Sequence, residues 1–151
     1  MIRWVLAAAY VALILLFSAQ PESSAGHMSR SFFYLFPNLS GAQIVELVFY
    51  LRKAGHVAAY FFGALLILYA VYGTPLLRRR PYLAALLLSF SVAALDEGYQ
   101  TTLPHRSGTV EDVLIDGVGI VSALLVAYAV SRRVGSRAEK EEMVYAENES
   151  G

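Results

Sequence analysis

The sequence contains no cysteine among its 151 residues. This absence excludes disulfide bonds, thiolate metal sites and a cysteine nucleophile, and it leaves the redox compartment open. The chain also lacks an excess of either charge, because twelve Lys and Arg residues balance twelve Asp and Glu residues. Without a basic excess we expect no nucleic-acid partner. The position of each charge along the chain is therefore more informative than the total.

Charged residues are scarce, at 16% of the chain, whereas hydrophobic residues make up 57% and mean hydropathy is +0.52. These values are too apolar for an ordinary soluble domain of this size, so an integral membrane protein is the first class to consider. A helix needs about 20 mostly apolar residues to cross the hydrocarbon core, where no water satisfies free backbone groups. Four stretches meet this length. They predict an all-α membrane protein with four transmembrane helices in an up-down bundle, at residues 2–19, 53–72, 81–100 and 111–131.

The basic residues indicate how such a bundle is oriented, because Lys and Arg in short loops tend to stay cytoplasmic. With four spans, eight basic residues fall on the side of both termini and four on the other side. We therefore expect a multi-pass protein of the cell membrane with cytoplasmic N and C termini, and loops 20–52 and 101–110 outside. The cytoplasmic group is Arg3, Arg78, Arg79, Arg80, Arg132, Arg133, Arg137 and Lys140, and the outer group is Arg30, Arg52, Lys53 and Arg106.

Three segments outside the central spans need separate interpretation. Arg3 precedes an apolar run, and Ser23 and Ala25 fit a small-residue cleavage site, so a cleaved signal peptide is an alternative for the first span. Ser40 predicts the N-terminus of a short helix extending to Leu51, which we expect to lie at the outer membrane interface. The chain then divides into a membrane domain at residues 1–133 and a polar, disordered cytoplasmic tail at 134–151.

Polar side chains gather at one end of the predicted bundle. The ends of the first and third spans and the starts of the second and fourth are neighbours in an up-down arrangement, so we expect one polar cavity facing outside. Spacings of three or four residues place these side chains on one face of each helix. A charge at membrane depth costs about 2.5–3.5 kcal/mol on insertion scales, so it needs a partner, water or a ligand. The group comprises Ser18, Gln20, Lys53, His56, Tyr60, Asp96, Glu97, Gln100, Glu111, Asp112 and Asp116.

Two kinds of chemistry fit these residue types, beside a purely structural role in which Lys53 or Arg106 pairs with Asp96 or Asp112. An imidazole beside a carboxylate supplies a general acid/base pair, and basic side chains hold an anionic group. No spacing matches a metal signature, so we expect no metal and no cofactor, with a divalent cation on oxygen ligands as an alternative. The catalytic candidates are His56, Asp96, Glu97 and Asp112; the ligand-binding candidates are Lys53, Tyr60, Gln100, Arg106, Asp116, Ser18 and Gln20.

The order of these motifs resembles the VanZ-like family, small membrane proteins named after a teicoplanin-resistance determinant. The matching segments are residues 17–21 (FSAQP), 52–56 (RKAGH) and 96–100 (DEGYQ), and they are joined by Tyr60, Pro104, Arg106, Asp112 and Gly119. The sequence departs from the family pattern at Ala59, where an acidic residue is frequent, and at Asp116, where Asn is frequent. The resemblance implies a cell-envelope function and a link to glycopeptide resistance, without an agreed mechanism.

The leading hypothesis is a membrane protein whose polar pocket binds an anionic or lipid-linked envelope component, so the expected partners are membrane lipids or a lipid-linked precursor. The alternative is a membrane-embedded hydrolase or group transferase acting on an envelope lipid. A third hypothesis, transport or proton coupling, is disfavoured because the predicted polar residues lie toward one face only. The sequence does not indicate an oligomeric state.

Overall fold

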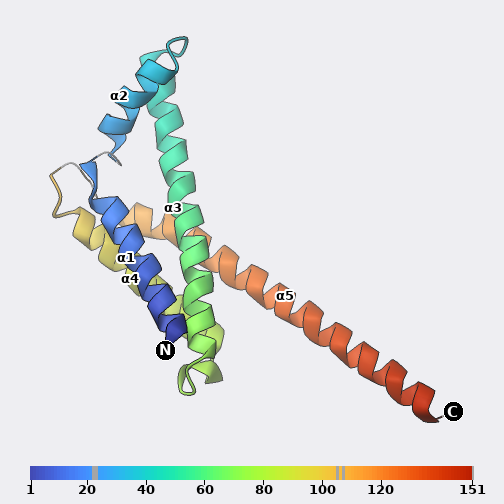
Figure 1. Cartoon of the computed structure of the whole chain (residues 1–151). Coiled ribbons are helices and arrows are strands. Elements are labelled where there is room, and N and C mark those ends of the chain that lie inside the picture. The colour runs from blue at the N-terminus through green and yellow to red at the C-terminus, as the bar shows by residue number, and fades with distance from the viewer. Residues whose placement is uncertain (22–23, 105, 107, 151) are drawn as a thin grey trace.

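The computed structural model describes residues 1–21, 24–104, 106 and 108–150, and of 138–150 only the backbone. Within these ranges every regular element is helical, which confirms the all-α fold (Figure 1). Four helices are long and apolar enough to cross a membrane: Ile2–Ala19, Gly41–Tyr72, Pro81–Gln100 and Val110–Arg137. The elements in order are α1 (Ile2–Ala19), α2 (Ala25–Leu35), α3 (Gly41–Tyr72), the 3-10 helix η2 (Leu77–Arg79), α4 (Pro81–Gln100) and α5 (Val110–Ser150).

The helix α3 differs most from the prediction, since it joins the expected second span to the expected short helix in one element of 32 residues. It begins where predicted, because Ser40 and Gln43 form a capping box with reciprocal side-chain bonds of 3.3 and 2.8 Å. No proline interrupts residues 41–72. The short extra helix in the first loop is α2 instead. At 1.5 Å per residue α3 is about 48 Å long, more than the hydrocarbon core needs.

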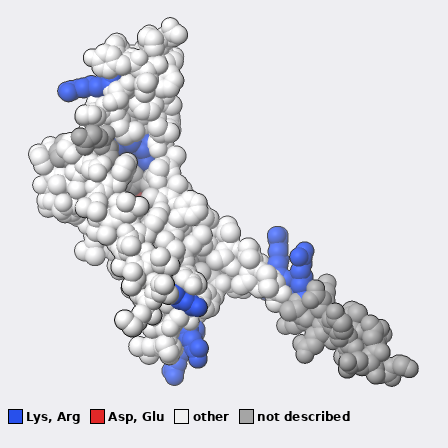
Figure 2. Space-filling view, viewed as in Figure 1, with Lys and Arg blue, Asp and Glu red and all other residues white. Residues whose placement is uncertain are grey.

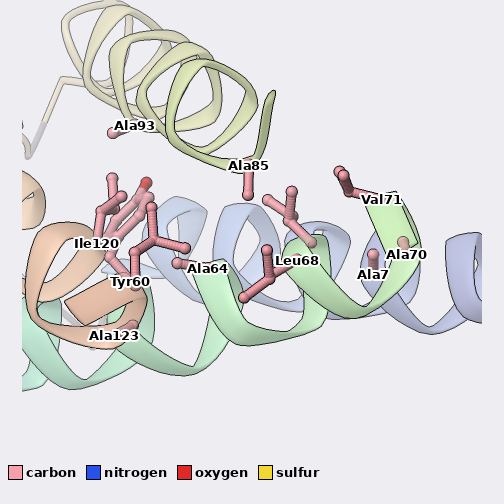
Figure 3. Packing of buried hydrophobic residues seen from close by; sticks show 12 residues of the cluster. Ala7, Tyr60, Ala64, Leu68, Ala70, Val71, Ala85, Ala93, Ile120 and Ala123 are labelled. Atoms are coloured by element: carbon pink, nitrogen blue, oxygen red, sulfur yellow. The ribbon is translucent and has the colours of Figure 1, made fainter. Parts of the chain in front are cut away.

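The centre of the bundle is α3, which contacts α1, α2, α4 and α5. Small residues alternate with larger apolar ones among the buried contacts at its C-terminal half. Figure 3 shows Ala70 and Val71 of α3 near Ala85 of α4 and Ala7 of α1, all at most 3% exposed. Small residues allow helix backbones to approach closely, which is the main source of packing energy between membrane helices.

The closest approach in the bundle joins α3 to α5. A Cβ atom at Gly119 would lie 2.3 Å from the carbonyl oxygen of Val57 and 3.1 Å from the nitrogen of Phe61. Only glycine permits this contact between the two backbones. Its neighbour Gly117 similarly lies under the Phe90 ring of α4. Both glycines therefore serve close packing within the bundle.

The fifth helix leaves the bundle at its C-terminal half. Ser131 still contacts α4, where its hydroxyl lies 3.2 Å from the Tyr82 hydroxyl, and α5 then projects away from the other helices (Figure 1). The backbone stays helical to Ser150. The polar, disordered cytoplasmic tail at 134–151 stays a prediction. Its Ala, Glu, Lys and Arg residues have high helix propensity. The domain boundary at residue 133 stays a prediction.

Basic residues cluster at the end of the bundle where α1 begins and α3 ends. Arg3 Nη1 donates to the Tyr69 carbonyl at 3.5 Å, and Trp4 Nε1 donates to Thr74 Oγ1 at 2.8 Å. Figure 2 shows Lys and Arg side chains at this end and along α5. The arrangement agrees with the grouping of charges in the sequence, while the side of the membrane stays a prediction. Ser23, of the alternative cleavage site, lies outside the described residues.

Candidate functional site

Asp96 joins three helices at the opposite end of the bundle. Its carboxylate is fully buried, and Oδ2 accepts hydrogen bonds from Tyr60 OH of α3 at 3.0 Å and from Ser18 Oγ of α1 at 3.2 Å. The other oxygen, Oδ1, has no hydrogen-bond partner among the described residues. The helix ends that the sequence predicts to be neighbours therefore do meet, through side chains up to 78 positions apart.

His56 of α3 contacts a carboxylate that the sequence analysis did not assign to it. Its Nδ1 lies 3.0 Å from Asp116 Oδ1 of α5, whereas we expected Asp96, Glu97 or Asp112 as the partner. Asp116 is fully buried, and its Oδ2 has no partner among the described residues. One of the two residues at which this chain departs from the family pattern, Asp116, is thus the one that pairs with the imidazole.

Glu97 fixes the loop that precedes α5. Its Oε1 accepts from Gln100 Nε2 at 3.0 Å, and its Oε2 accepts from the backbone N–H of Thr109 at 3.1 Å. Gly108 lies against the backbone of Glu97, where a Cβ atom would come 2.0 Å from the carbonyl oxygen. Sequence reasoning missed Thr109 and Gly108, because a loop residue gives no periodic signal.

Lys53 and Asp112 form an ion pair between α3 and α5. Thr109 holds the same carboxylate, because its Oγ1 donates to Asp112 Oδ2 at 2.9 Å and accepts from the Asp112 N–H at 3.1 Å. Thr109 therefore caps α5 while it orients Asp112. The pair is partly exposed and lies at the rim of the site. The structural pairing of Lys53 with Asp112, one of the alternatives from the sequence, is confirmed.

Arg106 reaches from the loop to the end of α1. Its Nε donates to the carbonyl oxygen of Ser18 at 2.9 Å, one of the backbone acceptors that a helix end leaves without an intrahelical donor. Burial, with a contribution from the nearby Arg52, lowers the pKa of the Arg106 guanidinium. Arginine stays charged at neutral pH in spite of such a shift. A half-buried cation therefore stands near the buried carboxylate of Asp96.

A cavity of about 410 Å³ opens between α1, α2 and α3. Its polar wall contains five side chains, four of them predicted from the sequence, with Arg52 as the addition. Figure 2 shows basic side chains in a hollow on this face of the molecule, with an acidic group just visible. The rest of the lining is mostly apolar. The polar wall consists of Arg52, His56, Tyr60, Asp96 and Arg106, with Ser18 at its edge; the apolar lining includes Leu13, Ile14, Phe17, Met28 and Leu51.

The remaining predicted residues lie around this cavity. Glu97, Gln100 and Asp116 are buried without lining it, whereas Gln20 is exposed at the C-cap of α1 and Glu111 is exposed on α5. The small residues of α3 have divided roles. Gly55 and Ala59 line the cavity, and the Ala59 carbonyl oxygen accepts a hydrogen bond from the Tyr10 hydroxyl of α1 at 3.2 Å. A Cβ added at Gly63 would lie 3.4 Å from the same Tyr10 ring.

One set of side chains has the geometry to hold a cation. His56, Glu97 and Asp116 come from three different helices, and one potential ligand atom of each lies within 4.8 Å of the others. Two further properties favour ligand binding: the cavity combines an apolar lining with basic groups, and the imidazole that lines it is held by a buried carboxylate.

Comparison with models of known protein families matches the family described as VanZ/LLP1 over residues 3–131. The match covers all four candidate spans almost completely and confirms the resemblance drawn from the sequence motifs. No curated protein and no solved structure matches the chain.

Proposed function

This chain belongs to the VanZ/LLP1 family, and we propose that it is a cell-envelope membrane protein whose cavity binds an anionic or lipid-linked amphiphile. The observation that carries the proposal is the composition of the cavity. Charged and hydrogen-bonding side chains line it together with a larger set of apolar ones. An amphiphile with an anionic headgroup matches both parts.

The basic groups in the cavity fit an anionic headgroup. Arg52 and Arg106 both line it, and guanidinium groups hold phosphate or carboxylate oxygens through paired hydrogen bonds. Two cations near one another repel, as their effect on the pKa of Arg106 indicates. An anion between them relieves that repulsion. The Tyr60 hydroxyl and the His56 ring add polar groups to the same lining.

The apolar part of the lining fits an acyl or isoprenoid chain. Leu13 and Phe17 of α1 line the cavity and are also 61% and 63% exposed, so the cavity is continuous with the lipid-facing surface of α1. A ligand that enters from the bilayer keeps its tail among apolar groups throughout. Met28 of α2 closes the cavity with a flexible side chain that adapts to different tails.

Native mass spectrometry tests this function, with phosphatidylglycerol and phosphatidylcholine as the two added lipids. We expect the wild type to retain phosphatidylglycerol preferentially, and Arg52→Gln to weaken that retention about tenfold, the value of one charge-assisted hydrogen bond. Arg30→Gln is the matched control, because Arg30 is exposed on α2 and does not line the cavity. Equal retention of both lipids by the wild type would reject an anionic ligand.

We further propose that the cavity faces the extracytoplasmic side, with both termini in the cytoplasm. The unequal distribution of Lys and Arg supports this orientation. The absence of cysteine makes the test direct, because Ser29→Cys on α2 and Ser136→Cys on α5 each introduce a single thiol. A membrane-impermeant maleimide added to intact cells should label S29C only. Labelling of S136C alone would show the opposite orientation and would contradict the proposal.

A link to glycopeptide resistance is part of the same proposal, and it rests on the family resemblance. If binding of an envelope amphiphile underlies resistance, expression of the wild type in a susceptible host should raise the inhibitory concentration of teicoplanin. Arg52→Gln should lower it again, and Arg30→Gln should not. An unchanged inhibitory concentration with the wild type would show that this protein does not confer teicoplanin resistance.

The second candidate function is hydrolysis or group transfer on an envelope lipid. His56 lines the cavity and is hydrogen-bonded to buried Asp116, an arrangement that orients an imidazole for acid/base catalysis. Turnover of a lipid phosphate by wild-type protein, lost in His56→Gln with lipid retention intact, would favour this function. Full turnover in His56→Gln would exclude His56 as the acid/base.

A further inference from the structure

We propose that His56, Glu97 and Asp116 bind a divalent transition-metal ion of the Mn²⁺ or Zn²⁺ type. The three residues come from α3, α4 and α5, and their potential ligand atoms lie within 4.8 Å of one another. This proposal replaces our expectation of no metal. The sequence carries no metal signature because the ligands are far apart along the chain and only the bundle brings them together. The inference does not depend on the proposed lipid ligand.

The spacing of the ligand atoms fits one ion. Bonds of about 2.1 Å to nitrogen and oxygen place adjacent ligand atoms roughly 3.0–3.5 Å apart and opposite ones about 4.2 Å apart. His56 Nδ1 and Asp116 Oδ1 are 3.0 Å apart, as two adjacent ligands would be. A pair at the upper limit of 4.8 Å would have to close by about 0.6 Å to become opposite ligands and by at least about 1.3 Å to become adjacent ones.

A second observation distinguishes this site from a simple cluster of acidic residues. Asp116 and Asp96 are both fully buried, and each has one carboxylate oxygen without a hydrogen-bond partner among the described residues. Buried carboxylate oxygens require hydrogen-bond donors or a cation, since burial removes their hydration. Asp116 is itself one of the three proposed ligand residues. A divalent ion at this position supplies the missing partner.

The surrounding hydrogen bonds hold the ligands in place. Gln100 and the Thr109 N–H donate to the two oxygens of Glu97, at 3.0 and 3.1 Å, and each oxygen keeps a lone pair for a metal. One imidazole nitrogen with two carboxylates favours Mn²⁺ or Zn²⁺ over Ca²⁺ and Mg²⁺, which take oxygen ligands almost exclusively. Because His56 also lines the cavity, the ion would stand directly behind the polar wall.

Metal analysis of the purified protein tests the proposal. The full chain in detergent is stripped with a chelator, equilibrated with Mn²⁺ or Zn²⁺, and analysed for bound metal and for thermal unfolding. We expect about one ion per chain, a higher unfolding temperature, and at least tenfold weaker binding in Asp116→Asn and Glu97→Gln. Glu111→Gln is the control, because Glu111 is an exposed carboxylate in the first turn of α5.

The spectrum of Mn²⁺ bound to the wild type provides a readout that needs no folded variant, because coupling to an imidazole nitrogen identifies His56 as a ligand directly. Electron–nuclear coupling to an imidazole nitrogen in the wild type should be absent in His56→Gln. Failure of the wild type to bind either ion at micromolar concentration would overturn the proposal, as would unchanged affinity in both Asp116→Asn and Glu97→Gln. Weaker binding in Glu111→Gln to the same degree would show only nonspecific attraction by acidic side chains, and would also overturn it.

Discussion

The two ends of the helix bundle are held together by different interactions. At the end with Ala7, Val71 and Ala85, small apolar side chains pack closely. At the other end, buried side chains such as Tyr60 and Asp96 connect the helices through hydrogen bonds. Lipid tails solvate apolar side chains as well as a protein core does, so close packing gains mainly van der Waals contacts. Buried polar groups gain specific hydrogen-bond partners instead. They lie at the end with Tyr60 and Asp96, which is therefore the end suited to ligand binding or catalysis.

The largest expected effect comes from Gly119, where α3 and α5 come close together beside the polar end. In Gly119→Ala the new Cβ would lie 2.3 Å from the Val57 carbonyl oxygen, and α3 and α5 must separate. We expect a loss of about 3 kcal/mol, at the upper end of overpacking substitutions. Thermal unfolding in detergent measures it. Gly135→Ala is the control, because nothing lies within 4 Å of its added Cβ, and a loss of similar size there would contradict the packing argument.

A smaller effect is expected from removing one hydrogen bond at the polar end. Tyr60→Phe deletes the hydroxyl that donates to Asp96 Oδ2 at 3.0 Å. Because Tyr60 is 3% exposed, water does not replace the lost donor, and we expect destabilisation of about 1.5 kcal/mol. Tyr99→Phe, which changes a 44% exposed tyrosine on α4, should have almost no effect. Equal unfolding temperatures for the two variants would show that the hydrogen bond to Asp96 does not contribute to stability.

The smallest effect is expected from the corresponding change at the apolar end. Trp4→Phe removes the bond from Nε1 to Thr74 Oγ1, which at 2.8 Å is shorter than the Tyr60 bond. Trp4 is 37% exposed, so polar surroundings compensate for the loss, and we expect about 0.5 kcal/mol. Chemical denaturation of Trp4→Phe beside Tyr60→Phe compares the two directly. If Trp4→Phe proves the more destabilising, bond length rather than burial decides the effect.

Much of the fold follows from the sequence because its causes are local. The bounds of α1 and α4 coincide with the predicted spans, since long apolar runs end at Gln20 and begin at Pro81. The capping box at Ser40 was also visible in the sequence. The length of the helix that follows the cap was not visible in the sequence. One continuous helix and two helices divided near residue 52 have nearly the same local preferences. Contacts of α3 with α2 and α5 decide between them.

The sequence by itself determined the fold class, the family and the gathering of polar side chains at one end of the bundle, because hydrophobic length and residue spacing carry that information. Only the tertiary structure decided which side chains meet. It paired His56 with Asp116, joined Lys53 to Asp112 at the rim, and placed Arg52 in the cavity. Helical periodicity fixes the face on which a residue lies, whereas its partner depends on how far each helix slides and rotates against its neighbours.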